Sequence, residues 1–130
     1  KPVKQGFHLI TDQVLAVLPE IKEIEIGLLH VFIKHTSASL TINENADPSV
    51  RSDMNKFFHK IVSENESYFD HNSEGLDDMP AHIRTALTHT SEQIPIMRGH
   101  LVLGTWQGIY LWEHRQHRYD RELVVHISGD

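Results

Sequence analysis

The chain has 130 residues, of which 39% are apolar, and it carries a formal net charge of −6. This length fits one domain with a buried core, and the acidic balance argues against a nucleic-acid binder that relies on a broad basic surface. Because the chain has 11 histidines and no cysteine, disulfides and thiolate sites are excluded, and any metal site must use histidine and carboxylate.

The first third of the chain predicts two or three strands and a short helix. Loose apolar alternation over Val3–Thr11 predicts a strand, and Asp12 is typical of the N-terminal cap of a short helix that Pro19 ends. The segment Glu25–Thr36 is almost continuously apolar and rich in branched and aromatic residues, so we place it centrally in the sheet. Ser39–Asn43 then forms a hairpin-like pair with this strand or continues it beyond a bulge.

Asp47 and Pro48 mark the clearest helix start, an acidic cap followed by proline at the first helical position. Apolar residues recur every three or four positions up to about Glu64, which predicts an amphipathic helix. This apolar stripe consists of Val50, Met54, Phe57, Phe58, Ile61 and Val62. Asp53 lies on the same stripe, where a carboxylate should be paired or functional.

A polar, aperiodic segment over residues 64–80 has the length at which a loop is usually functional or disordered. A second helix is predicted from Pro80 to about Thr88, with Asp77 or Asp78 as its cap. The chain from Glu92 onward predicts three or four strands with glycines at turns or bulges. Since strands outnumber helices and do not alternate with them, we expect an α+β fold. It would be a single domain over residues 1–130 with a mostly antiparallel β-sheet, two main helices and a short N-terminal helix.

The strand predicted after Gly108 becomes polar towards its end. One face of a regular strand here carries Ile109, Leu111, Glu113, Arg115 and His117. A core face that turns ionic is typical of a pocket wall, although a strand that leaves the core for solvent would show the same pattern. Arg115, Arg118 and Arg121 lie three residues apart and suit phosphate or carboxylate, but arginines near a chain end are also common as surface charges.

Three histidines are candidates for a metal site. His35 lies at the end of the central strand, where a hydrogen-bonded core histidine is the more common alternative. His71 in the polar loop and His82 in the first turn of the second helix have a spacing that matches no standard zinc signature. Imidazoles from different elements are nonetheless suitable ligands. Carboxylates available beside them as further ligands or orienting groups are Glu44, Glu74, Asp77 and Asp78. No nucleophile signature or glycine-rich phosphate loop accompanies them.

Together, four segments resemble the YjbQ family of secondary thiamine-phosphate synthases. They are His35–Asp53, His71–His82, Ile94–Arg115 and the trailing Arg118 and Arg121, and they cover nearly the whole chain in the right order. The resemblance implies a small α+β domain that assembles as a homotrimer, with a polar pocket for a metal or an anion. The implied reaction joins a hydroxymethylpyrimidine diphosphate to a thiazole phosphate and releases pyrophosphate, as a weak activity beside an unsettled main role.

The resemblance also implies roles for individual residues. The catalytic candidates are Glu44, Glu113 and Arg115. The substrate-binding candidates are Asn43, Trp106, Gln107, Arg115, Arg118 and Arg121. The candidate ligands of a divalent metal, zinc or magnesium, are His35, His71 and His82. Other matching positions are Asp47, Asp53, Glu74 and Asp78. Asp78 stands where we expect asparagine in many relatives, and its extra negative charge would tighten a metal or weaken an anion.

Two other functions fit the same residues. One is a metal-dependent, phosphate-handling hydrolase, in which a histidine-bound metal activates water. The other is a non-catalytic protein that binds a phosphorylated metabolite, which the lack of a nucleophile favours. The sequence therefore leaves open whether the chain is an enzyme. We expect a small phosphorylated metabolite as partner, no nucleic acid and no membrane, since no apolar run approaches the ~20 residues needed to span a bilayer. A cytoplasmic location is expected.

Overall fold

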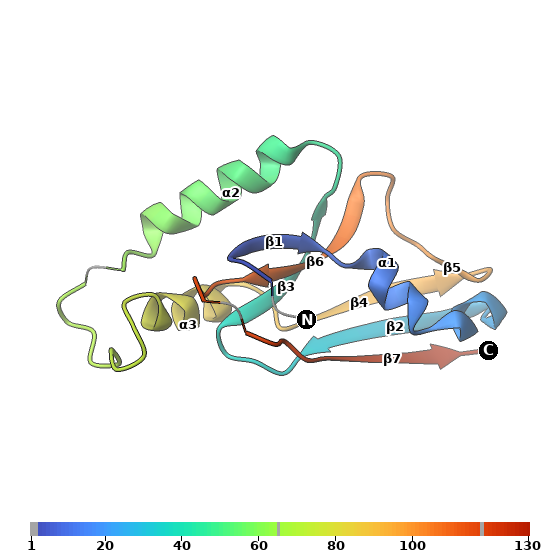
Figure 1. Ribbon diagram of the computed structural model, residues 1–130. Helices are drawn as coiled ribbons and strands as arrows, with labels where there is room; N and C mark the ends of the chain where they lie inside the picture. The colour runs from blue at the N-terminus through green and yellow to red at the C-terminus, as the bar shows by residue number, and fades with distance from the viewer. Residues whose placement is uncertain (1–2, 65, 118) are drawn as a thin grey trace.

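The chain folds into two antiparallel β-sheets with helices packed at their ends (Figure 1). This computed structural model describes residues 3–64, 66–117 and 119–130. In chain order the elements are β1 (Gly6–Leu9), α1 (Thr11–Ala16), the 3-10 helix η1 (Pro19–Glu23), β2 (Ile26–Ile33), β3 (Ala38–Glu44), α2 (Pro48–Ile61), α3 (Asp78–Leu87), β4 (Ser91–Met97), β5 (His100–Leu101), β6 (Gln107–Glu113) and β7 (Leu123–Gly129). The strand orders are β1-β6-β3 and β5-β4-β2-β7. No helix among the described residues is long and apolar enough to cross a lipid bilayer.

The core lies where the apolar faces of the two sheets meet. Alternate residues of β2, such as Leu29 and Val31, are buried, while the residues between them face outward. Ile109 of β6 and Leu40 of β3 enter the same cluster from the other sheet, and Val14 joins it from α1. The α+β class and the antiparallel pairing predicted from the sequence are confirmed. β2 is central, between β4 and β7, as the apolar segment indicated.

Two local predictions are wrong. β2 and β3 are not a hairpin pair or one bulged strand, because residues 34–37 carry the chain from one sheet to the other. Asp12 does not cap α1: the helix begins at Thr11, with Ile10 at the cap position and no side-chain cap bond. The Thr11 hydroxyl instead accepts a hydrogen bond from the Ile109 N–H at 2.9 Å, which ties the helix start to β6.

Helix α2 begins as predicted but packs less than predicted. Asp47 caps it by accepting from the Ser49 N–H at 2.9 Å, with Pro48 at the first helical position. No residue of α2 is buried, and the side chain of Phe57 is 57% exposed. Asp53 is exposed as well, so the stripe gives it no buried position that would demand a partner. Two residues of the apolar stripe, Phe57 and Ile61, therefore lie uncovered in a single chain, whereas Val62 is buried.

Helix α3, in contrast, is a buried element that carries polar groups into the molecule. Its buried residues include Asp78 and Arg84. Asp77 occupies the cap position, but its side chain makes no cap hydrogen bond and turns towards the end of β6 instead. Asp78 and His82 stand one turn apart on the same helical face, so α3 presents both to the loop that precedes it.

Candidate functional site

An open pocket of about 330 Å³ lies where the end of β6, the start of α3 and the segment after β2 converge. The residues that line it include His35, Asp78, His82, Arg115, Tyr119 and Arg121. They come from three separate stretches of chain, so that only the fold brings them together. Of the two alternatives for the end of β6, the pocket wall describes Glu113 and Arg115, which are 0% and 4% exposed, whereas His117 on the same face is exposed.

Two histidines and one aspartate form a compact cluster at this pocket. Nε2 of His71 lies 2.7 Å from Oδ2 of Asp78, and Nε2 of His82 lies 3.4 Å from Oδ1. One ligand atom from each of the three residues lies within 4.8 Å of the others. The Asp78 carboxylate is buried, and its Oδ2 accepts no hydrogen bond from a described residue, although Nε2 of His71 lies at ion-pair distance from it. A buried carboxylate oxygen without a partner is costly, and a bound cation would remove that cost.

The tautomer of His82 supports the same reading. Its Nδ1 lies 2.9 Å from the carbonyl oxygen of Thr36, which can only accept, so Nδ1 carries the proton. Nε2, the other ring nitrogen, lies 3.4 Å from Oδ1 of Asp78, and without a proton it would face this oxygen as an acceptor. Two acceptors that face each other repel unless a proton or a metal ion lies between them. A backbone carbonyl that fixes the tautomer in this way is the usual outer support of a metal-binding histidine.

The two described arginines of the pocket are held by carboxylates. Arg115 donates from Nε to Asp77 at 3.0 Å, from Nη1 to Asp78 at 2.7 Å and from Nη2 to the carbonyl of Glu74 at 2.9 Å. Burial acts to lower its pKa, but pairing with Asp77 outweighs burial and raises it. For Asp77, burial acts to raise the pKa, yet the Gln116 N–H and Arg115 together hold it below its usual range.

Arg121 is paired in a similar way. Its Nε and Nη2 donate to the two oxygens of the buried Glu113 carboxylate, and Nη2 also donates to the Ser37 hydroxyl at 3.1 Å. Tyr119 covers both guanidinium groups, with its ring centroid 5.1 Å from Cζ of Arg115 and 5.3 Å from that of Arg121. Neither arginine therefore offers an uncompensated charge to a phosphate. Arg118 lies outside the described residues.

His35 lines the pocket but lies outside the cluster. Its Nε2 accepts from the Glu122 N–H at 2.7 Å, so this nitrogen is not available to a metal. Partial burial and then the charge of Arg121 lower the pKa of His35, which keeps the ring neutral near pH 7. In a single chain, His35 is therefore a hydrogen-bonded histidine, which was the alternative to a metal ligand.

The remaining candidates lie at the opposite end of the β3–β6 pair. Glu44 pairs with Gln107 at that end, whereas Ala38 pairs with Glu113 at the pocket end. Six residues of strand separate the two ends by about 20 Å. The group at the far end consists of Asn43, Glu44, Trp106 and Gln107. A single chain thus divides the predicted site into two groups.

Residues of the far group have local structural partners. Glu44 accepts from the Asp47 N–H at 2.7 Å beside the start of α2, and the Asn43 amide contacts the sulfur of Met54. The Gln107 side chain accepts from the Gly104 N–H and closes the turn before β6. Trp106 is 62% exposed. Within one chain, these contacts hold the start of α2 and the turn before β6 in place.

Sequence reasoning did not single out a buried pair on the other face of β6. His114 is 1% exposed, and its Nε2 lies 2.9 Å from the hydroxyl of Ser39. Burial, and then the charges of Arg84 and Arg121, lower the pKa of His114 to about 3. The available signal was parity, which places His114 opposite Glu113 and Arg115. Whether other elements bury the face that carries His114 could not be predicted from the strand alone.

Comparison with known proteins agrees with the fold. A family model described as UPF0047 protein YjbQ-like matches residues 1–130. A UPF0047 protein of Synechocystis is 52% identical over 126 residues, which cover 97% of this chain and 85% of that protein. The UPF0047 protein YjbQ of Salmonella typhimurium is 48% identical over 97% of this chain and 91% of its own.

Solved structures give the same result. An uncharacterized conserved protein of the YjbQ/UPF0047 family from Clostridium acetobutylicum superposes with a TM-score of 0.82 at 36% identity, covering 98% of both chains. A hypothetical protein from Aeropyrum pernix also reaches 0.82, at 26% identity, covering 100% of this chain and 96% of its own. The sequence resemblance is thereby confirmed over the whole length of the chain, which belongs to the YjbQ/UPF0047 family.

Proposed function

We propose that the chain binds a divalent metal ion through His71, Asp78 and His82 and acts on a small phosphorylated metabolite. The observation that carries this proposal is the buried Asp78 carboxylate, whose oxygens lie 2.7 Å from Nε2 of His71 and 3.4 Å from Nε2 of His82. Two imidazoles and one carboxylate suit zinc, whereas magnesium prefers oxygen ligands alone. When bound, such an ion supplies a Lewis acid that polarises a phosphoryl oxygen or activates water.

The other residues of the pocket position this ligand set. Arg115 holds the Asp78 carboxylate through Nη1 and anchors the loop through the Glu74 carbonyl. The Thr36 carbonyl fixes the ring of His82. The side chain of His71 is 49% exposed, so the cluster opens to solvent on that side and a substrate can approach. Three protein ligands leave a coordination position for it, as in catalytic zinc sites.

The thiamine-phosphate synthase reaction implied by the family resemblance is our first candidate. Loss of a diphosphate leaving group requires charge neutralisation and little covalent help from the protein. Because Arg115 and Arg121 are already paired with carboxylates, we assign that neutralisation to the metal rather than to the arginines. The second candidate is a metal-dependent phosphate hydrolase, which the ligand set of two histidines and a carboxylate favours.

Metal binding should depend on His71 and His82 but not on His35. After treatment with a chelator and dialysis, the wild type should take up one zinc ion per chain. His71→Ala and His82→Ala each remove a direct ligand, so we expect the zinc affinity to fall at least ~100-fold, the upper range for loss of a supporting residue. His35→Ala is the matched control and should keep wild-type affinity. Elemental analysis and competition with a chromophoric chelator measure both quantities. A wild type without stoichiometric metal would contradict the assignment.

Turnover should require the same cluster. We expect release of pyrophosphate from the two synthase substrates, or release of phosphate from a simple ester, at a rate that chelation abolishes and zinc restores. Asp78→Asn keeps the shape of the side chain but removes its charge, and should reduce the rate at least tenfold, while His35→Ala should not. If neither assay exceeds background but phosphorylated ligands raise the melting temperature, the protein is a binder rather than an enzyme.

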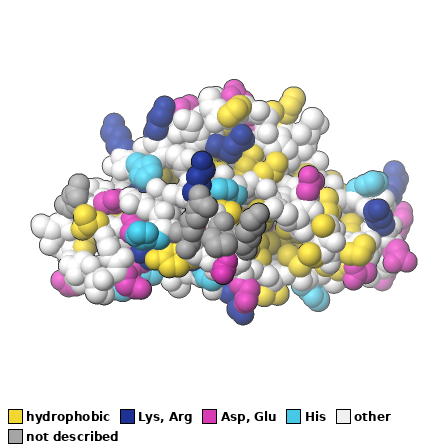
Figure 2. Space-filling model, in the orientation of Figure 1, with side chains coloured by type: hydrophobic (Ala, Val, Ile, Leu, Met, Phe, Trp, Pro, Cys, Tyr) yellow, Lys and Arg dark blue, Asp and Glu magenta, His cyan; other side chains and the backbone are white. Residues whose placement is uncertain are grey.

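We extend the proposal to assembly as a homotrimer, which the family resemblance implies. Its support is the amount of apolar surface that one chain leaves uncovered. On the outer face of the four-stranded sheet, Ile26 is 68% exposed and Met97 50%, and Phe57 of α2 adds a second patch. Figure 2 shows hydrophobic side chains gathered over the half of the molecule that contains α1 and the four-stranded sheet. Sedimentation equilibrium tests this proposal, because the mass should be three times 15.0 kDa.

A further inference from the structure

The four-stranded sheet has an outer face that is apolar where the open side of an antiparallel sheet is usually polar. We call it the outer sheet face. It consists of the even residues of 26–32 in β2, the odd residues of 91–97 in β4 and the even residues of 124–128 in β7, which alternate with the buried or half-buried positions of these strands. Its apolar members are Ile26, Leu28, Phe32, Pro95, Met97 and Val124. Exposed apolar surface that is continuous in this way marks an interaction site.

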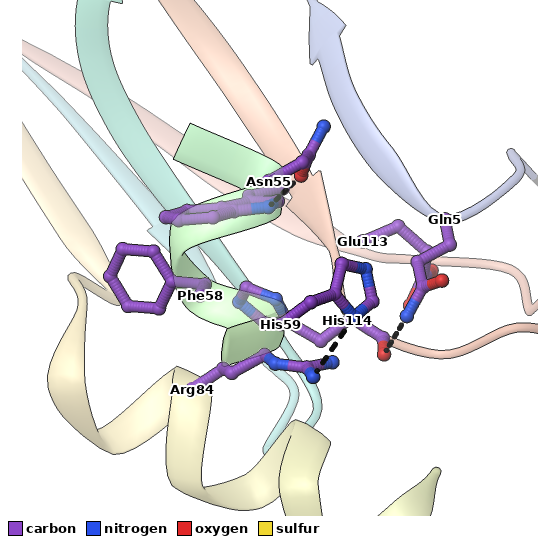
Figure 3. Close-up of a pocket in the computed structure, with 8 residues that line it drawn as sticks. Gln5, Asn55, Phe58, His59, Arg84, Glu113 and His114 are labelled. Carbon is purple, nitrogen blue, oxygen red and sulfur yellow. Dashed lines mark hydrogen bonds between the residues drawn. The ribbon is translucent and has the colours of Figure 1, made fainter. Parts of the chain in front are cut away.

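No helix in the described part of the chain covers the outer sheet face. The two longer helices pack on the three-stranded sheet instead: the ring of Phe58 in α2 meets Trp112 of β6 edge-on, and α2, α3 and β6 together line a small polar cavity (Figure 3). On the outer sheet face, Ile26 stays 68% exposed, and Leu28 and Phe32 stay 43% exposed. Since a sheet buries an apolar face against a second layer, a layer from outside the chain would complete this one.

The outer sheet face also lacks formal charge. None of its positions, all of which the structure describes, is Asp, Glu, Lys or Arg, although these residues make up 23% of the chain. Its polar positions are serine, glutamine and histidine. Charged side chains begin at its border, where Lys34 pairs with Glu122 at 2.9 Å. Depletion of charge in the centre and a polar rim are the composition of a protein–protein interface.

The missing charge favours a second copy of this chain as the partner. Two chains that each carry a net charge of −6 repel each other, and they repel least where neither presents a charged group. A basic partner would instead be drawn to the acidic parts of the surface. An uncharged apolar face on an acidic chain therefore suits contact between identical chains.

The relief of the outer sheet face suits packing against the same face of another copy. Large side chains of β2 lie directly beside small ones, since Phe32 pairs with Ser91 of β4 and Leu28 pairs with Ser128 of β7. Apolar ridges with hollows next to them can interdigitate when two such faces pack about 10 Å apart.

We propose that the outer sheet face is the interface between copies of this chain, and that in the assembly it turns towards the symmetry axis and packs against the same face of the neighbouring copies. This inference rests on the proposed homotrimer and adds the surface through which it assembles. Of the two apolar patches that one chain leaves uncovered, only this one lies in the interface. The patch on α2, with Phe57 and Ile61, stays outside it.

Single lysine substitutions test the interface through the mass of the assembly. Leu28 and Val124 are 43% and 49% exposed in one chain, so lysine at either position would be tolerated if nothing covered it. In an interface, lysine places a charge in the apolar centre. Leu28→Lys and Val124→Lys should therefore sediment at the single-chain mass of 15.0 kDa where the wild type has three times this mass. Phe57→Lys, at a position that is 57% exposed, is the matched control and should keep the wild-type mass.

A milder substitution measures directly whether the face is covered. Because the chain has no cysteine, one introduced thiol can be followed alone. The thiol of Leu28→Cys should react with a maleimide at least ~10-fold more slowly than that of Ile61→Cys, whose position on α2 is 51% exposed. Dilution until the assembly dissociates should remove this difference. If a lysine variant does not fold, the two cysteine variants still decide.

The outcomes separate this inference from the proposals on which it rests. If the wild type has the mass of three chains but Phe57→Lys dissociates it and Leu28→Lys does not, the interface lies elsewhere and only the inference is overturned. Equal reaction rates of the two thiols in the assembled protein would overturn it as well. A wild type of single-chain mass would overturn the inference and the homotrimer together. Uptake of zinc by the wild type is measured separately and tests the metal site alone.

Discussion

The free energy of unfolding should fall by about 3 kcal/mol between pH 7 and pH 4 because of His114 alone. Burial, reinforced by the charges of Arg84 and Arg121, lowers the pKa of this histidine to about 3 in the folded state, against about 6.5 in the unfolded chain. Between these two values the unfolded state binds more protons. Stability is therefore complete above about pH 6.5 and is lost progressively as the pH falls towards 3.

His114→Gln should flatten this pH dependence. The variant keeps a polar group near Ser39 and cannot take up a proton, so its stability should decline by up to about 1.4 kcal/mol less per pH unit than that of the wild type. Some slope should remain, because partial burial also lowers the pKa values of His35 and His59. Urea unfolding at pH 7, 6, 5 and 4 measures the difference. His100→Gln, an exposed change, is the control and should follow the wild type. Parallel curves for His114→Gln and the wild type would contradict the buried, neutral histidine.

Local patterns in the sequence predicted the elements well. The Asp47–Pro48 pair located the start of α2 because a cap and a first-turn proline act on adjacent residues. Parity along β6 predicted that Glu113 and Arg115 share a face that turns ionic, and both are buried at the pocket. Likewise, His82 was expected in the first turns of a helix preceded by adjacent acids, and α3 carries it beside Asp78. Each of these inferences needs only neighbouring residues.

Long-range pairing was beyond the reach of the sequence. Glu44 follows His35 by nine residues, yet β3 runs away from the pocket and carries Glu44 to its far end. Which end of a strand meets which partner depends on the pairing register, and register is fixed by contacts between segments far apart in sequence. The partners of Arg115 were missed for the same reason: Asp77 and Asp78 precede it by 38 and 37 residues. The arginine was consequently expected to bind phosphate, whereas a single chain already neutralises it.

Arg115→Met should destabilise the protein by about 3–5 kcal/mol, because it leaves two buried carboxylates without their counter-charge. Asp77 and Asp78 are 5% and 2% exposed, and both lie within hydrogen-bond distance of the guanidinium group. The loss is a large share of the 5–15 kcal/mol that typically holds a domain together, so the melting temperature should fall by roughly 10–20 °C. Lys34→Met, which breaks the exposed pair with Glu122, is the matched control and should cost at most about 1 kcal/mol.

The double variant Arg115→Met with Asp77→Asn separates a lost counter-charge from lost packing. If uncompensated charge causes the instability, the neutral amide should recover a substantial part of it, since a buried asparagine needs hydrogen bonds but no cation. The Gln116 N–H, which donates to Asp77 at 2.7 Å, remains to bond the amide oxygen. Zinc should also stabilise Arg115→Met more than the wild type, because the proposed metal would supply Asp78 with the positive charge that it loses when Arg115 is replaced. Thermal unfolding of the wild type, Arg115→Met, Asp77→Asn and the double variant, with zinc and with a chelator, gives both comparisons. A double variant as unstable as the sum of its single changes would place the effect in packing instead.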